Sequence, residues 1–288
     1  LIREWLKESQ NEIPEYLNEI VFYLGQNYNF LWQNTGQNLL FNGNHISQNN
    51  DFDKYLSFHN YKFRSESNEY GGYAILRNKN FILSIDLGSS PDRKFSNDYQ
   101  SGALSFEVFF NNCRLISNCG YFQNYKHQLN SISKSTATHS TVVIDNRSSC
   151  KFKKDSDGIF KIDQGLKILK KSVISDKKYW NISGSHDGYL KKYGIIHERK
   201  IEFFVEENKF IGTDKLIKKK KFKKSNFEIR FHFEPGTKIT KTQDEKSILI
   251  ELENSGWKFL CEDYKIDVET GLYFGKKNSF VENQNIFI

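Results

Sequence analysis

The sequence predicts a mainly β protein, an antiparallel β-sandwich preceded by a short helical segment, and three observations support this fold class. Apolar and polar residues alternate from Gly71 onward in short segments separated by turn residues, which is the period of strands. The apolar residues are dominated by Phe, Tyr and Ile, which pack well on a pleated surface, and there are only 3 Pro. Helical spacing is confined to the first forty residues.

The helical signals lie at the N-terminal end. The segment LIREWLKES has apolar residues at helical spacing, and Pro14 opens a second candidate helix that ends near Gly25. Two short helices cannot bury their apolar faces alone. We therefore expect residues 1–45 to be the last helices of a larger helical unit and residues 46–288 to form the sandwich. The chain begins with Leu1 and contains no Met, so we expect it to be part of a longer protein.

Two hairpins can be read directly from the sequence. Residues 73–87 predict two strands around Asn78-Lys79-Asn80, and residues 103–122 predict two more around Asn111-Asn112. Asn favours such turns because it tolerates a positive φ. Further strand-like segments follow up to residue 275 without intervening helices. Many short strands in this order predict an antiparallel sandwich or a barrel-like fold.

The charge of the chain leaves several classes of partner open. The 42 basic and 35 acidic residues give a net charge of +7, which would attract an acidic glycan, a phosphate backbone or an anionic membrane equally well. We expect no membrane span, because no apolar run approaches the roughly 18 residues that one needs. The basic run at 215–225 predicts a solvated hairpin tip, since only Phe222 interrupts its lysines. We accordingly expect no nucleic-acid partner.

Several other chemistries lack their sequence signals. There is no GxSxG elbow, P-loop or dinucleotide fingerprint. Asp98, Glu107 and Asp145 have no spacing that indicates the paired carboxyl groups of a glycoside hydrolase. The cysteines show no CxxC spacing, so we expect free thiols at Cys113, Cys119, Cys150 and Cys261.

The most distinctive part of the sequence is residues 70–146. It contains YGGYAILRNKNFILSIDLG, then YQSGALSFEVFFNNCRLISNCGYFQNY, then STATHSTVVIDN. These segments resemble the β-sandwich domain of heparinase II/III-like proteins, with STATHSTVVID as the most specific match. The resemblance covers roughly residues 12–285, and later segments such as HDGYLKKYGIIHERKI and FEIRFHFEPG also look like strands of that family.

The resemblance implies a two-part protein, in which an upstream α/α toroid precedes this sandwich. Family members that are lyases cleave the glycosidic bond of a uronic acid by β-elimination. That reaction requires neutralisation of the uronate carboxylate, a base for the adjacent proton and an acid for the leaving oxygen. In such relatives most of these groups come from the toroid. The resemblance also implies a bacterial periplasm or cell-envelope location, which the residues themselves leave open.

Family lyases bind a structural zinc ion through a His, an Asp and a second His, and the resemblance maps these positions onto Gln100, Asn118 and His139. Carboxamides are poor zinc ligands compared with imidazole or carboxylate, so we expect no metal and no other cofactor here. The position two residues before Gln100 can carry a catalytic His in the family. In this sequence it is Asp98.

Six residues are candidates for the functional site. His139 is the first candidate for catalysis, as a cleft residue whose pKa is close to neutral; the alternative is a buried histidine bonded to Asn118 or to a backbone carbonyl. Tyr121 and Tyr125 flank the same loop and are the other catalytic candidates. Gln100, Asn118 and Arg230 are candidates for substrate binding. Arg230 could contact an anion together with His232, which we expect to be solvated.

Two functions from different classes follow. The first is a polysaccharide lyase-like protein that acts by β-elimination on an acidic, uronate-containing glycan, with this chain as its C-terminal half. The second is a non-catalytic carbohydrate-binding or structural sandwich module with a degenerate metal site. A third possibility, nucleic-acid binding through the lysines of residues 218–224, predicts an affinity for DNA that falls steeply with salt.

Overall fold

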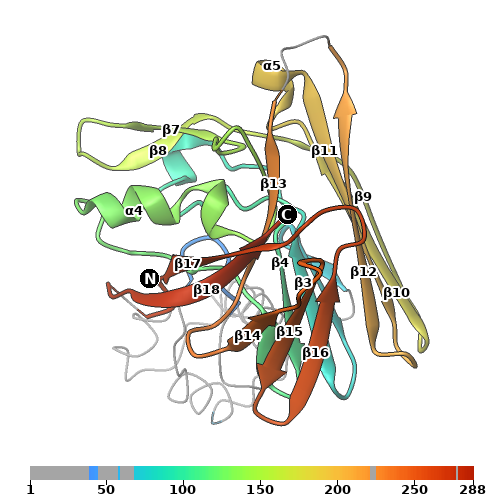
Figure 1. The fold of residues 1–288 in the computed structure, drawn as a ribbon. Coiled ribbons are helices and arrows are strands. Elements are labelled where there is room, and N and C mark those ends of the chain that lie inside the picture. The colour runs from blue at the N-terminus through green and yellow to red at the C-terminus, as the bar shows by residue number, and fades with distance from the viewer. Residues whose placement is uncertain (1–38, 45–57, 59–67, 221–224, 277) are drawn as a thin grey trace.

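The structure is a computed structural model that describes residues 39–44, 58, 68–220, 225–276 and 278–288 (Figure 1). Its sheets are built from antiparallel strand pairs. The predicted mainly β, antiparallel class is therefore confirmed. The two helices expected before residue 25 lie outside the described residues.

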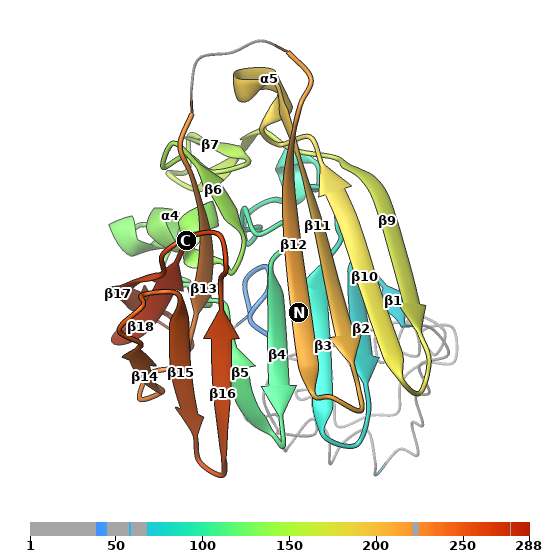
Figure 2. The same ribbon diagram turned by 45° about the vertical axis from the view of Figure 1, so that its right-hand side comes forward.

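Two sheets pack against each other to form the main core (Figure 2). The first has the order β1-β2-β3-β4-β5 and consists of Glu69–Tyr70, Tyr73–Arg77, Phe81–Asp86, Phe106–Phe110 and Cys113–Ile116. The second has the order β12-β11-β10-β9, in which β9 to β12 are Ile168–Ser175, Tyr179–His186, Ile195–Phe204 and Lys209–Lys218. Phe81 of β3 contacts Phe203 of β11 with ring centroids 4.6 Å apart, so one apolar core joins the two sheets.

Smaller sheets complete the molecule. A four-stranded sheet has the order β17-β18-β13-β6, with β6, β13, β17 and β18 at Val142–Ile144, Phe227–His232, Asp267–Tyr273 and Val281–Phe287. A three-stranded sheet consists of β14, β15 and β16, at Lys238–Lys241, Ser247–Leu252 and Ser255–Leu260. Trp257 of β16 packs on Phe110 at 5.2 Å between ring centroids, so this sheet closes one end of the main core. β7 and β8 form a separate hairpin, Lys151–Lys154 and Phe160–Gln164.

Helices are short in the described part of the chain. They are α4 and α5 at Gln128–Ser133 and Leu190–Tyr193, and the 3₁₀ turns η2 and η3 at Arg93–Phe95 and Thr136–Thr138. In Figure 1, α4 lies below the β7-β8 hairpin, away from the β9–β12 sheet. His127 caps α4, because its Nδ1 accepts the backbone N–H of Leu129 at 3.2 Å. The polar chain around α4 has no apolar stripe that would have predicted a helix.

Both hairpins expected from the sequence are present. β2 and β3 are joined through Asn78, whose side chain accepts the backbone N–H of Phe81 at 2.7 Å. β4 and β5 are joined by Asn111 and Asn112, with φ of 47° and 67°. Two consecutive residues with positive φ match the right-handed twist of the flanking strands. These turns were predictable because they depend on local backbone preference alone.

The expectation of a hairpin at the basic run is wrong. β12 pairs with β11 along its whole length, whereas β13 pairs with β6 and β18. The lysine-rich segment therefore connects strands of two different sheets. A local pattern could not show this, because the pairing partners of β13 lie far away in the sequence. The four cysteines are free thiols, as expected, and no described helix is long and apolar enough to cross a membrane.

A connector, residues 39–44, contacts the first sheet. Leu39 and Phe41 pack with Ile75, Ile82 and Phe109 on the side of the sheet away from the main core. The sequence assigns this segment to the upstream helical unit, and the boundary at residue 45 stays a prediction. In the structure the connector is bound to the sandwich.

Candidate functional site

Three segments meet at the end of β5, where the sequence predicts the functional site. They are the loop 96–102, the turn 117–122 and the segment 135–141. The backbone N–H of Cys119 donates to the carbonyl of Thr138 at 2.9 Å, and the side chain of Asn118 accepts the N–H of Ser140 at 2.9 Å. Gln100 Nε2 donates to the carbonyl of Gly120 at 2.9 Å. The predicted site residues from these segments therefore form one polar cluster.

His139 lies inside this cluster and is 1% exposed. Its Nδ1 lies 2.9 Å from the carbonyl of Ser135; a carbonyl only accepts, so Nδ1 carries the proton. Burial lowers the pKa of His139 from 6.5 to about 4, so the ring is neutral at pH 7. Gly102 faces the ring, and a Cβ at Gly102 would lie 2.5 Å from His139 Cδ2. This geometry is that of the buried histidine bonded to a backbone carbonyl.

Gln100 and Asn118 are buried and use their carboxamides within the protein. Gln100 donates to the carbonyls of Gly120 and Ser133, and its Oε1 accepts the N–H of Gly43 at 3.1 Å. Asn118 Oδ1 is occupied by Ser140. These neutral oxygens already accept hydrogen bonds, so Gln100, Asn118 and His139 do not fit the zinc site of the family. Within the described ranges, no three His, Cys, Asp or Glu side chains group as metal ligands.

Tyr121 is fully buried beside the cluster. Its hydroxyl donates to the carbonyl of Asn97 at 3.0 Å and accepts from Asn130 Nδ2 at 2.9 Å. Burial raises its pKa far above the ordinary value. The Lys134 ammonium lies 5.7 Å from the ring centroid. Through its hydrogen bond to Asn97, Tyr121 helps to hold the loop that contains Asp98 in place.

Tyr125 and Asp98 form the solvent-facing part of the site. The Tyr125 hydroxyl donates to Asp98 Oδ1 at 2.7 Å. Asp98 is exposed and Tyr125 is half-buried. Partial burial, and then the hydrogen bond to Asp98, raise the pKa of Tyr125 to about 12. The phenol is therefore protonated at neutral pH and is held in one orientation by the carboxylate.

Arg230 lies apart from this pair, on β13. Its guanidinium binds Glu228 Oε2 at 2.7 Å and also pairs with Glu269. These two carboxylates neutralise the positive charge of Arg230, the residue that was predicted to bind substrate. His232, which we expected to be solvated, is 1% exposed, so that expectation is wrong. Its Nδ1 donates to Asn285 Oδ1 at 2.7 Å, on the neighbouring strand β18.

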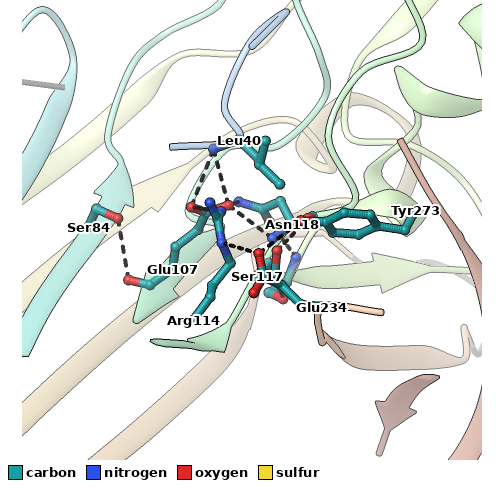
Figure 3. A network of polar contacts seen from close by, with 9 residues as sticks. Leu40, Ser84, Glu107, Arg114, Ser117, Asn118, Glu234 and Tyr273 are labelled. Carbon is teal, nitrogen blue, oxygen red and sulfur yellow. Dashed lines mark hydrogen bonds and ion pairs between the residues drawn. The ribbon is translucent and has the colours of Figure 1, made fainter. Parts of the chain in front are cut away.

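A buried charge network around Glu107 contacts the cluster through Asn118, and it was not predicted from the sequence (Figure 3). Glu107 accepts from Arg114 Nη1 at 2.7 Å and from the backbone N–H groups of Asn118 and Leu40 at 3.1 and 3.2 Å. Arg114 also pairs with Glu234 at 3.2 Å. The sequence signal for this network was Glu107, a lone charged residue in the apolar strand FEVFF. Phe109, on the same face of the strand as Glu107, packs against the connector.

Lys134 is a second buried charge that the sequence analysis missed. It is 0% exposed, and its ammonium donates to the carbonyls of Phe160 at 2.9 Å, of Ser96 at 3.4 Å and of Asn97. Burial lowers its pKa to about 8. Lys134 thereby ties the loop carrying Asp98 to β8. No sequence signal distinguishes it from the many solvated lysines of this chain.

The connector also contacts the site loop. The backbone N–H of Gln100 donates to Asn42 Oδ1 at 3.0 Å, and Gly43 packs against Asp98 so closely that a Cβ would lie 2.7 Å from Asp98 Cβ. Asn42 Nδ2 in turn donates to Tyr73 at 2.7 Å and to Asp86 at 3.1 Å. The position of Asp98 is therefore set jointly by the connector and the sandwich.

The buried histidines predict how stability depends on pH. The pKa values of His139 and His232 fall from 6.5 in the unfolded chain to about 4 and about 3, mainly through burial. The unfolded chain therefore binds more protons between these values, and stability present above pH 6.5 is lost as pH falls. His139 alone should contribute about 3 kcal/mol of this loss by its folded pKa.

Urea denaturation at a series of pH values between 6.5 and 4 measures this loss, and the His139→Gln variant should show a shallower slope. Carboxyl groups with lowered pKa values, such as Asp214, titrate below this window. Burial raises the pKa of Asp86 to about 7, so this carboxyl adds stability as pH falls and partly offsets the effect of the histidines. The difference in slope between the two proteins therefore isolates the contribution of His139, and equal slopes would contradict the assignment.

The fold and the site together define an antiparallel β-sandwich domain built around a buried histidine–carboxamide cluster with an exposed tyrosine–aspartate pair. Residues 62–288 match the family described as "Heparinase II/III-like, C-terminal". The chain belongs to this family, and the resemblance noted from its motifs is confirmed. A comparison with curated proteins gave no match.

Solved structures of similar fold include heparan sulfate lyase HepC from Pedobacter heparinus, with a TM-score of 0.72 at 14% identity over 96% of this chain and 44% of that one. Another is the Heparinase III-BT4657 gene product, with a TM-score of 0.71 at 15% identity over 96% of this chain and 45% of that one. A structure of heparinase III gives 0.71 at 14% identity, over 96% and 47%. The likeness is one of fold, and this chain spans less than half the length of each.

Proposed function

We propose that this chain is the sandwich half of a polysaccharide lyase that acts by β-elimination on an acidic, uronate-containing glycan. The observation that carries the proposal is the solvent-facing Tyr125–Asp98 pair, held over a buried polar cluster in a member of this family. An upstream toroid domain of the same protein would supply the other wall of the cleft. The net charge of +7 favours an acidic substrate over a neutral one.

In the elimination, a base removes the proton beside the uronate carboxylate, a carbon–carbon double bond forms, and the bond to the leaving oxygen breaks. The leaving oxygen must then receive a proton. We assign this step to Tyr125, whose pKa of about 12 keeps the phenol protonated until a strongly basic oxygen develops. Asp98 orients the hydroxyl. The base and the groups that neutralise the substrate carboxylate are assigned to the upstream domain.

His139 and Tyr121 take a different role in this proposal from the catalytic one predicted from sequence. Both are buried, at 1% and 0% exposure, and a residue that acts on a polymer must touch it. We propose that they position the loop carrying Asp98, as do Gln100 and Asn118 through their hydrogen bonds. Arg230 would bind substrate only by leaving its two carboxylate partners.

The test is product formation by the protein as its gene encodes it. Heparan-, alginate- and other uronate-type polymers are supplied, and ultraviolet absorbance records the unsaturated uronate product. Tyr125→Phe should lower kcat about 100-fold or more, since general acid catalysis contributes roughly that factor. Asp98→Asn should lower it less, because the amide still orients the phenol.

Matched controls are Tyr264→Phe and Asp157→Asn, which alter exposed residues in connections between strands, remote in sequence from the pair. Both should leave kcat unchanged. Full activity of Tyr125→Phe would remove the role of Tyr125. No product from any acidic polymer would remove the lyase proposal altogether.

A non-catalytic carbohydrate-binding module is the second candidate function. This function is favoured by four buried residues whose polar groups form hydrogen bonds within the protein: Gln100, Asn118, Tyr121 and His139. In that case, the full-length protein should bind acidic polymers and release no unsaturated product from them.

A further inference from the structure

The outer face of the β9–β12 sheet carries an ordered pattern of lysine and hydroxyl side chains. Strand residues alternate between faces, and Trp180, Ile182, Ile201 and Phe203 point into the main core. The intervening residues face outward. The strand register aligns them in two neighbouring rows, Lys170–Ser185–Glu198–Lys215 and Ser172–Ser183–Lys200–Thr213. In Figure 2 this sheet forms an outer layer of the molecule.

The eight residues of these two rows line a hollow with a volume of about 690 Å³. The two central strands contribute Ser183, Ser185, Glu198 and Lys200, and the two flanking strands contribute Lys170, Ser172, Thr213 and Lys215. Ser185 is 3% exposed, yet its hydroxyl forms no hydrogen bond with any described residue. Because Ser185 lines the hollow, this hydroxyl is available to a ligand. The hollow therefore has the composition of a polar binding site.

The opposite face of the same strands makes the floor of the hollow rigid. His197 donates through Nε2 to Asp214 at 2.6 Å, and Arg199 binds both oxygens of Asp214 at 2.8 and 2.9 Å. Arg199 also donates to the carbonyls of Leu104 and Ser140, outside this sheet. These inward residues alternate along the strands with the outward residues of the hollow. The spacing of the outer side chains is thus fixed before any ligand arrives, which lowers the cost of binding.

We propose that this hollow is a second saccharide-binding site, which holds a short acidic segment of glycan away from the Tyr125–Asp98 pair. Three ammonium groups, on Lys170, Lys200 and Lys215, can donate to carboxylates or sulfates on the sugar. Glu198 and the serine hydroxyls can accept from ring hydroxyls. A phosphate backbone carries few such donors and would face the Glu198 carboxylate, so a saccharide fits the mixed lining better.

The lysines can exchange their present partners for a ligand. Lys200 pairs with Glu202 at 2.7 Å and is 41% exposed, and Lys215 lies 3.9 Å from Glu198 with 65% exposure. Lys170 forms no ion pair with any residue that the structure describes. Exposed ion pairs contribute little to stability, so breaking them costs little. The ligand class rests on the proposed function, whereas the site itself rests on the geometry of the hollow.

Lysine footprinting on the protein as its gene encodes it tests this site. Acetylation rates are measured by mass spectrometry with four probes: a sulfated uronate oligosaccharide, an unsulfated oligouronate, a neutral oligosaccharide and a single-stranded oligonucleotide. At least one acidic oligosaccharide should slow acetylation of Lys170, Lys200 and Lys215 about tenfold at saturation. Lys238, which pairs with Glu251 at 2.8 Å much as Lys200 pairs with Glu202, is the internal control and should react unchanged.

The Ser172→Glu variant adds a repelling charge at an exposed position and should abolish the protection, while Ser279→Glu should not. Protection by the unsulfated oligouronate would assign recognition to carboxylates, and protection by the sulfated probe alone would assign it to sulfates. Absence of protection by both, or equal protection by the oligonucleotide, would overturn the proposal. Protection without unsaturated product would remove only the lyase function, and product without protection would remove only this site.

Discussion

Replacing Arg199 by alanine should lower the free energy of unfolding by roughly 3 to 5 kcal/mol, the effect of leaving a buried charge without its partner. Arg199 is 2% exposed and binds Asp214 through two hydrogen bonds. It also donates to the carbonyls of Leu104 and Ser140 at 3.0 and 2.6 Å. Its loss therefore leaves the Asp214 carboxylate without its guanidinium partner, bonded only to the His197 ring, and leaves the carbonyls of Leu104 and Ser140 without this donor. Urea denaturation at neutral pH measures the change.

The Lys178→Ala variant is the matched control for Arg199→Ala. Lys178 pairs with Glu206 at 3.1 Å, but the two side chains are 77% and 70% exposed. Removing such a pair should change stability by less than about 1 kcal/mol. The Arg199→Ala/Asp214→Ala double variant should recover part of the loss, because it no longer buries a lone charge. A loss from Arg199→Ala as small as that of the control would show that the buried Arg199–Asp214 pair does not stabilise the fold.

Replacing Glu107 by alanine should cost a similar amount, about 3 to 5 kcal/mol. Glu107 is 0% exposed and accepts from Arg114 and from the backbone of Leu40 and Asn118 (Figure 3). The substitution leaves two buried N–H groups without acceptors. Arg114 keeps its pairing with Glu234. Denaturation measures the loss of stability, and amide hydrogen exchange measures release of the connector.

Hydrogen exchange separates a local role of Glu107 from a global one. Leu40 and Asn118 should lose protection first, since their amides bond directly to the carboxylate. Amides of the β9–β12 sheet should keep theirs under native conditions. Glu107→Gln should retain part of the protection, because one oxygen can still accept. Unchanged exchange at Leu40 in Glu107→Ala would show that the connector is held by apolar contacts alone.

The features that were predictable from sequence depend on local preferences. Alternation gave the strands, and paired asparagines with positive φ gave the turn between β4 and β5. The family resemblance mapped Gln100, Asn118 and His139 onto one site, which implies that the Thr-His-Ser segment lies beside the Asn-Cys-Gly-Tyr turn. The hydrogen bond from the backbone N–H of Cys119 to the carbonyl of Thr138 confirms that the two segments are adjacent.

The features that were missed depend on contacts between distant residues. The crossover between β12 and β13 places them in different sheets, which no local pattern shows. His232 alternates with phenylalanines and so seemed solvated, but β18 covers it and Asn285 satisfies its ring. Lys134 looks like any other lysine, and only the carbonyls that converge on it reveal its burial.

The same reasoning explains why the candidate site was only partly predicted. Residue identity located the cluster of Gln100, Asn118 and His139, but it could not show that their polar groups would be satisfied internally. Exposure depends on the whole fold. In the folded chain Tyr125 and Asp98 are accessible to solvent, whereas His139 is buried. The proposed catalytic role is therefore assigned to Tyr125 and not to His139.

The lyase proposal is tested most directly by the ratio of unsaturated uronate ends to new reducing ends when the protein cleaves an acidic polymer. Elimination creates one double bond for every bond broken, so the account predicts equal numbers of the two ends, with both lost together in Tyr125→Phe. Reducing ends without matching unsaturation would mean hydrolysis, and would contradict the chemistry assigned to this site.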